Sequence, residues 1–169
     1  MDVIPRDARV VPVRFDGKLR FVIWGLHEND DNCLLAIDDR IRSYETVVEC
    51  LAFELKSHRK VHYLEDEPIL DFDGILGWIK RKAGLPDFNA ALELWNFALD
   101  VANTIDVTPT LLGRRRSVTL YAKLFDANVA WAAPDEIVGE PWTGAELEAL
   151  HALLLQAGQL VRTSIPLAG

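Results

Sequence analysis

The chain has 169 residues and a formal net charge of −8, and half of its residues are hydrophobic. This size and composition fit one globular domain, residues 1–169, and exclude a disordered chain. The acidic balance excludes nucleic acid as the main direct ligand, because phosphate binding requires a basic face.

The two cysteines, Cys33 and Cys50, are too few and too far apart in the sequence for a disulfide framework or a zinc site. The first residues lack the basic and apolar regions of a secretory signal. No uncharged run reaches the length that crosses a bilayer. We therefore expect a cytoplasmic protein that has no membrane contact, no bound metal and no other cofactor.

Residues 11–15 and 19–23 alternate apolar and polar side chains around an Asp-Gly turn, which predicts a β-hairpin. Asp-Gly often forms a two-residue loop, but that loop would place Phe15 opposite Lys18. A three-residue loop instead pairs Phe15 with Leu19, so that apolar residues share one face, and we prefer this register.

Residues 32–37 predict a third strand, which completes an N-terminal three-stranded antiparallel sheet over residues 8–38. One apolar sheet face requires a cover, and residues 43–165 predict four to five helices that supply it. The predicted fold class is therefore α+β.

The first helix is predicted to begin at Ser43 as N-cap and to place one apolar stripe on the sheet, made by Tyr44, Val48, Leu51 and Leu55. The second is predicted over residues 72–83, because Gly84 and Pro86 follow it.

The third helix is predicted from Asn89 to Ile105, where apolar residues recur at helical spacing without a miss, and we expect it to be the most buried. Residues 117–125 fit a helix or a strand. The last helix has the clearest start, because Thr143 and Glu146 form a capping box and Trp142 can pack onto Leu147.

The stretch Asp71-Phe72-Asp73-Gly74 resembles the Asp-x-Asp-Gly motif of haloacid-dehalogenase-type phosphatases. That resemblance implies a nucleophilic Asp71, a general acid Asp73 and magnesium between them. No strand and helix alternation precedes the motif, and no later acidic pair completes a magnesium site. The alternative is that Asp71 or Asp73 caps the helix that follows.

Two long stretches carry charge of one sign. Residues 61–79 hold five carboxylates and residues 124–161 hold six more, and neither stretch contains Lys or Arg. Such stretches create a negative field that speeds encounter with a basic partner, although solvated loops and helix N-termini also collect acids.

Three tracts are similar to those of bacterial immunity proteins of contact-dependent growth-inhibition systems. They are the Trp-Asn-centred tract Leu92–Ala102, the tract Leu120–Phe125 with Asn128 after it, and Pro141–Thr143 with Glu146. Together they cover residues 90–162.

This resemblance implies a non-enzymatic protein that binds the C-terminal toxin domain of a cognate effector, as a monomer in a 1:1 complex. Such toxins are often nucleases with basic clefts. The family identifies no contact residue here, so the predicted partner-binding residues come from charge and from one aromatic in a short loop: Glu65, Asp66, Glu67, Asp71, Asp73, Trp131, Asp135 and Glu136. The alternatives are a phosphatase-like hydrolase that uses Asp71 and Asp73, and a small intracellular adaptor.

Overall fold

The computed structural model describes residues 2–57, 60–110, 115–129 and 141–166. Within these ranges a strand-rich first part is followed by a helical second part. This arrangement confirms the predicted α+β class. The strands are β1 (Arg6–Phe15), β2 (Lys18–Leu26), β3 (Asn32–Leu34), β4 (Ala36–Ile37), β5 (Arg40–Ile41), β6 (Ser43–Tyr44), β7 (Val61–His62) and β8 (Leu70–Asp71), and the helices are α1 (Val47–Ser57), α2 (Asp73–Arg81), α3 (Phe88–Thr104), α4 (Arg115–Val129) and α5 (Gly144–Ser164).

The centre of the sheet is the predicted antiparallel set, in the order β3-β2-β1. Strands β7 and β8 then add to the free edge of β1 in parallel, and β6 pairs with β2. The predicted third strand is divided, because residues 36–37 leave β2 and form a separate small hairpin with β5. The sheet is therefore mixed, and its added strands come from beyond the predicted sheet region.

The β1–β2 hairpin closes with two residues, so the predicted three-residue loop is wrong. Asp16 and Gly17 both adopt positive φ angles, 51° and 73°, which a two-residue hairpin turn of the primed type requires. Phe15 accordingly pairs with Lys18. The local preference of Asp-Gly determines the loop length here.

The same register places Val13 opposite Arg20, yet Arg20 is 6% exposed. Its aliphatic part is buried, and its guanidinium forms an ion pair of 2.8 Å with Glu45. The expectation that apolar residues must share one face failed because both faces of the sheet are covered.

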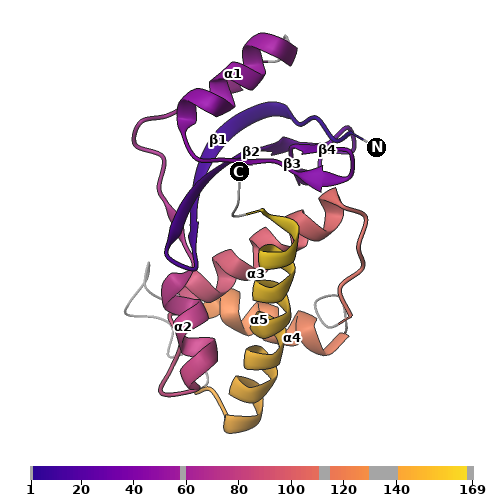
Figure 1. The fold of residues 1–169 in the computed structure, drawn as a ribbon. Coiled ribbons are helices and arrows are strands. Elements are labelled where there is room, and N and C mark those ends of the chain that lie inside the picture. The colour runs from indigo at the N-terminus through magenta and orange to yellow at the C-terminus, as the bar shows by residue number, and fades with distance from the viewer. Residues whose placement is uncertain (1, 58–59, 111–114, 130–140, 167–169) are drawn as a thin grey trace.

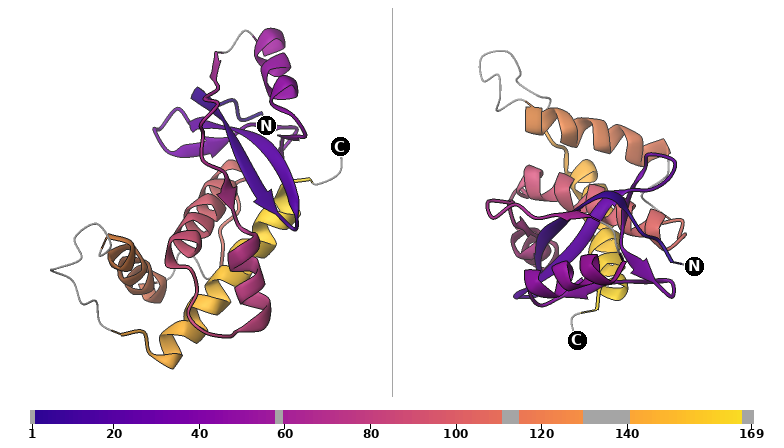
Figure 2. Two further views of the ribbon diagram at one scale, coloured as in Figure 1. Left: turned by 90° about the vertical axis from the view of Figure 1, so that its left-hand side faces the viewer. Right: turned by 90° about the horizontal axis from the view of Figure 1, so that it is seen from above.

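Figure 1 shows α1 on one side of the sheet and α3 and α5 on the other, and the turned view in Figure 2 (left) shows the same arrangement. Val10 and Ile23 pack with Cys50 of α1 in a smaller cluster. Val13 and Phe15 point the other way, into the main core. A chain that buries both faces of a short sheet has apolar residues at successive positions, which hides the period-two signal.

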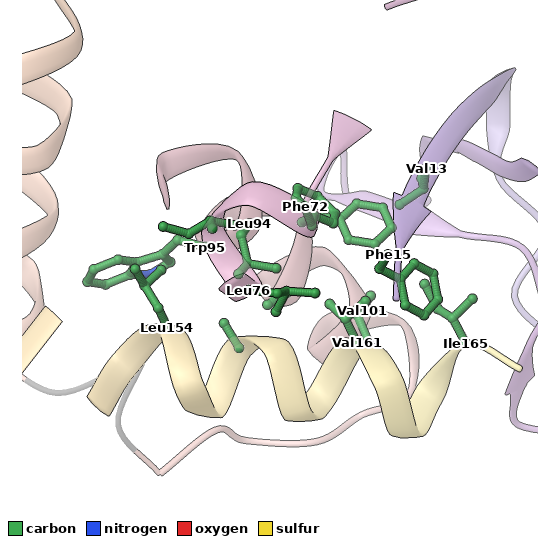
Figure 3. Packing of buried hydrophobic residues seen from close by; sticks show 14 of the residues in the cluster. Val13, Phe15, Phe72, Leu76, Leu94, Trp95, Val101, Leu154, Val161 and Ile165 are labelled. Carbon is green, nitrogen blue, oxygen red and sulfur yellow. The ribbon is translucent and has the colours of Figure 1, made fainter. Parts of the chain in front are cut away.

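The main core lies between α3, α5 and the sheet (Figure 3). Leu94, Trp95 and Val101 of α3 meet Leu154 and Val161 of α5, and all five are at most 2% exposed. The prediction that this third helix is the most buried is confirmed in its sequence range and its packing.

The start of the first helix differs from the prediction. Ser43 and Tyr44 belong to β6, and α1 begins at Val47 after Thr46, whose hydroxyl accepts from the Glu49 amide at 3.3 Å. Val48 is 74% exposed rather than part of the buried stripe. The Ser43 prediction failed because these residues find backbone partners in β2.

The remaining helices follow the sequence signals. Helix α2 ends at Arg81, and Lys82 adopts the left-handed conformation. The undecided stretch 117–125 lies within helix α4, and the capping box of Thr143 and Glu146 opens α5. Among the described residues, none of the helices has the length and apolar character needed to cross a membrane.

Candidate functional site

The chain between α1 and α2 runs along the outer edge of β1. Strand β7 pairs with Ala8 and Arg9, and β8 pairs with Val13 and Arg14, both in parallel. Residues 63–69 connect these two short strands and are called the edge segment below. It contains three of the predicted partner-binding residues, Glu65, Asp66 and Glu67.

Two of the predicted carboxylates are compensated by arginines of β1. Glu67 lies 3.3 Å from Arg9, and its side chain is only 11% exposed. Asp71 forms a hydrogen-bonded ion pair of 2.7 Å with Arg14. Their negative charge therefore holds the edge segment and β8 onto the sheet and contributes little to a field outside the molecule.

Asp73 serves the fold in a similar way. Its carboxylate accepts the backbone N–H of Gly17 at 3.1 and 3.2 Å, which joins the start of α2 to the hairpin turn. Asp71 in turn accepts the backbone N–H of Asp73 at 3.1 Å. This bond satisfies a backbone donor at the start of α2. The N-cap of α2 is Phe72, which makes no side-chain cap bond, so of the helix-capping alternative only the acid in the first turn, Asp73, is found.

Glu65 and Asp66 remain, and they lie between exposed apolar side chains. Among the described residues neither forms an ion pair, and Tyr63, Leu64 and Ile69 beside them are 40%, 60% and 42% exposed. The predicted acidic face is thus reduced to two carboxylates on an apolar segment. Trp131, Asp135 and Glu136, the other predicted contacts, lie outside the described residues.

The arrangement at Asp71 and Asp73 offers no support for the phosphatase interpretation. The Arg14 guanidinium lies against Asp71, at 2.7 Å, and the Asp73 carboxylate is bonded to backbone. Within the ranges that the structure describes, no group of three or more His, Cys, Asp or Glu side chains could hold a metal ion.

A concave site lies at the opposite edge of the sheet, where the β2–β3 turn meets the end of α3. Its volume is about 260 Å³. The carboxylates in its described lining are Asp31 and Asp106, one from each of these elements. The full lining is His27, Asn29, Asp31, Asn32, Cys33, Ala102, Asn103, Asp106, Val107 and Thr108. We call it the turn pocket.

Asp100 lies behind the Asn32 and Cys33 wall of this pocket. It is 7% exposed, and no described group donates a hydrogen bond to its Oδ2. Burial raises the pKa of Asp100 to about 7, and the nearby charge of Asp31 adds to the shift, while Asn32 and Trp24 oppose it. A carboxyl group this poorly compensated is costly to bury, and such groups gather at functional sites.

Sequence reasoning missed Asp100 because it stands in a wide apolar helix face and belongs to no motif. The feature of the sequence that could have indicated Asp100 is its position between Phe97 and Val101, which are both fully buried. An acid at that point of a buried face is unusual. Cys33, beside it, is also buried, which raises its pKa to about 11, so it stays a neutral thiol.

Comparison with known proteins yields a similar fold but no family. No protein-family model matches this chain, and no curated protein matches it in sequence. Among solved structures, the crystal structure of the SatS C-terminal domain in complex with bromine is similar. It is 10% identical with a TM-score of 0.57, and the alignment covers 94% of this chain and 92% of that chain. The two proteins therefore share a fold over almost their whole length.

Proposed function

We propose that this chain binds a basic protein partner through its edge segment. The observation that carries the proposal is that, in the described part of the chain, exposed apolar side chains and unpaired carboxylates lie next to each other in this segment. Leu64 is 60% exposed, and Glu65 and Asp66 follow it without an ion pair among the described residues. Apolar anchors beside carboxylates suit a partner with a basic, partly apolar surface, since the apolar contacts set the lifetime of the complex and the charges speed its formation.

The partner we propose is the C-terminal toxin domain of a contact-dependent growth-inhibition effector, which the chain would neutralise in the cytoplasm in a 1:1 complex. The net charge of −8 favours encounter with a toxin that has a basic cleft. No cofactor is required, because neutralisation by binding needs only that the toxin surface is covered.

The tracts that resemble immunity proteins also support a division of roles. Trp95 in α3 meets Tyr121 in α4 edge-to-face with ring centroids 5.4 Å apart, and the Tyr121 hydroxyl donates to Asn96 at 2.9 Å. Lys123 joins the third tract through Glu146 at 2.8 Å. Residues of the tracts thus hold α3, α4 and α5 together, which leaves binding to a different surface.

The deciding experiment is a co-expression assay. The C-terminal domain of the large secreted protein encoded next to this chain should be toxic when expressed alone and harmless when this chain is co-expressed. Protection should be lost in the triple variant Leu64→Ser, Glu65→Lys, Asp66→Lys, whose substitutions lie on an exposed segment and leave the core intact.

The matched control changes charge on another exposed face. Asp126→Lys changes the charge at one exposed site of α4 by the same amount as each Lys substitution in the triple variant. The chain that carries Asp126→Lys should protect as well as the unchanged chain. Toxicity that persists when the unchanged chain is co-expressed contradicts the immunity function. Protection that survives the triple variant contradicts the edge segment as the binding surface.

A further inference from the structure

The turn pocket collects negative charge from several independent sources. Asp31 and Asp106 stand in its walls, and Asp100 lies behind them. Helix α3 also ends here, and the C-terminal end of a helix dipole carries partial negative charge. None of the described residues that line the pocket is Lys or Arg, so its own walls supply no compensating cation.

Arg6 of β1 reaches the same turn, but it is already engaged. Its Nε donates to the backbone carbonyl of His27 at 3.1 Å, and its guanidinium forms an ion pair with Asp30. Asp30 is outside the pocket lining, and no cation among the described residues is paired with Asp31.

Both walls of the pocket are held in place by local bonds. Asn29 donates to the Asp31 carboxylate at 2.7 Å and accepts the Asp31 backbone N–H at 3.2 Å. On the other wall, the Val107 amide donates to the Ala102 carbonyl at 2.9 Å and fixes the turn after α3. Acceptors fixed before binding reduce the entropy that a ligand must overcome.

We propose that the turn pocket binds a guanidinium group. The volume of about 260 Å³ lies below the range of about 300–1,000 Å³ that is common for drug-sized ligands, and it suits one side chain or a small cation. A guanidinium is planar and carries five donors, which suits a pocket lined by two carboxylates, Asp31 and Asp106, from two separate elements. A divalent metal would require a tighter group of ligands, which the described residues lack.

Asp100 adds a coupling to pH. A cation in the pocket favours the charged form of Asp100, so binding should tighten as this carboxyl loses its proton. Asp31 and Cys33 face it from the turn and from β3. Asp31 disfavours the charge of Asp100, and the Cys33 thiol stays neutral over the same range.

The test is an NMR titration of the full chain with methylguanidinium and with the capped peptide acetyl-Gly-Arg-Gly-amide, at constant ionic strength. We expect saturable shifts of amide signals in residues 29–33 and 103–108, with tighter binding at pH 8 than at pH 6. Asp31→Asn and Asp106→Asn should each weaken binding by about tenfold, as expected for the loss of a charge-assisted hydrogen bond. Asp100→Asn should remove most of the pH dependence.

The two probes separate the possible sources of the group. Tighter binding of the peptide indicates an arginine of a protein partner, and tighter binding of methylguanidinium indicates a small metabolite. Asp126→Asn removes one negative charge at a distant exposed site and should change nothing.

Equal weakening by Asp126→Asn, or shifts spread over the whole surface, would overturn the proposal in favour of general attraction. Saturation of the same amides by Ca²⁺ at lower concentration would replace the guanidinium by a metal. This site is separate from the edge segment, so either result leaves the co-expression assay unaffected.

Discussion

Asp16 in the β1–β2 turn and Arg162 near the end of α5 are joined by two hydrogen bonds of 2.7 Å. The bonds lie between residues 146 positions apart in the sequence. They connect the tip of the hairpin to the last helix, and they lower the pKa of Asp16, chiefly through the hydrogen bond from Arg162.

The first prediction tests this pair by a double-mutant cycle with Asp16→Asn and Arg162→Gln. Asn tolerates the positive φ of position 16, so the turn itself is preserved. Because the pair is partly exposed, we expect a coupling free energy of about 1 kcal/mol in urea unfolding. The folded-state pKa of Asp16 is depressed, so the coupling should be present at pH 7 and should be lost as the pH falls through that pKa. A coupling that is the same at pH 7 and at pH 2 would contradict this account.

The second prediction concerns Asp100, whose pKa of about 7 in the folded state lies far above its ordinary value. The folded state therefore holds a proton that the unfolded state has lost, and the free energy of unfolding should fall as the pH rises from about 4 to 7. Asp100→Asn removes this cost. We expect the variant to gain about 2 kcal/mol at pH 8 and less than half of that at pH 5, as measured by urea unfolding.

The exposed control Asp126→Asn should show no such difference between the two pH values. An equal gain for Asp100→Asn at pH 5 and pH 8 would mean that its charge has no part in the effect.

The third prediction concerns Gly25 in β2. A Cβ atom at this position would lie 2.5 Å from the backbone oxygen of Arg6, because the register of β1 shifts between Arg6 and Arg9 and brings the backbones together. A backbone atom cannot turn aside as a side chain can. Gly25→Ala should therefore destabilise the fold by about 1–3 kcal/mol in thermal or urea unfolding.

Gly144→Ala is the matched control, since a Cβ at the start of α5 meets no atom within 4 Å. It should leave stability unchanged or raise it slightly. Equal stability of the two variants would contradict the close approach at Gly25.

The fourth prediction concerns the start of α5. The Thr143 hydroxyl accepts the Glu146 backbone N–H at 3.2 Å, and the Glu146 carboxylate accepts the Thr143 backbone N–H at 2.8 Å. Thr143→Ala should cost about 1 kcal/mol in urea unfolding. In the same helix, Thr163→Ala removes only hydroxyl bonds to preceding carbonyls and should be neutral or slightly stabilising. A cost at position 163 that equals the cost at position 143 would argue against capping.

The elements that the sequence predicted best are those whose signal is local. The capping box at Thr143 lies within four residues, and the apolar residues of α3 recur every turn. Both patterns can be recognised without knowing which distant residues pack against them. The α+β class followed from such signals. The predicted hairpin register is wrong because it required only one buried sheet face, whereas α1 covers the other face as well.

The candidate site was less predictable because charge counts along a segment ignore partners far away in the chain. Asp71 and Arg14 are 57 positions apart, and the residues next to Asp71 in the sequence do not predict that ion pair. Asp100 presented the opposite problem. Asp100 is notable because it is buried against a turn that lies far away in the sequence. A single acidic residue inside a helix does not predict that burial.

The short strands β7 and β8 have a consequence for how the edge segment meets a partner. Both ends of the segment are fixed to β1, by backbone pairing and by Arg9 and Arg14. A loop that is fixed at both ends loses less conformational entropy on binding than a free tail of equal length. The same strands pair with Ala8, Arg9, Val13 and Arg14 on the outer side of β1, where a bare strand would recruit foreign chains into the sheet. The same two strands thus hold the proposed binding segment rigid and protect part of a sheet edge against aggregation.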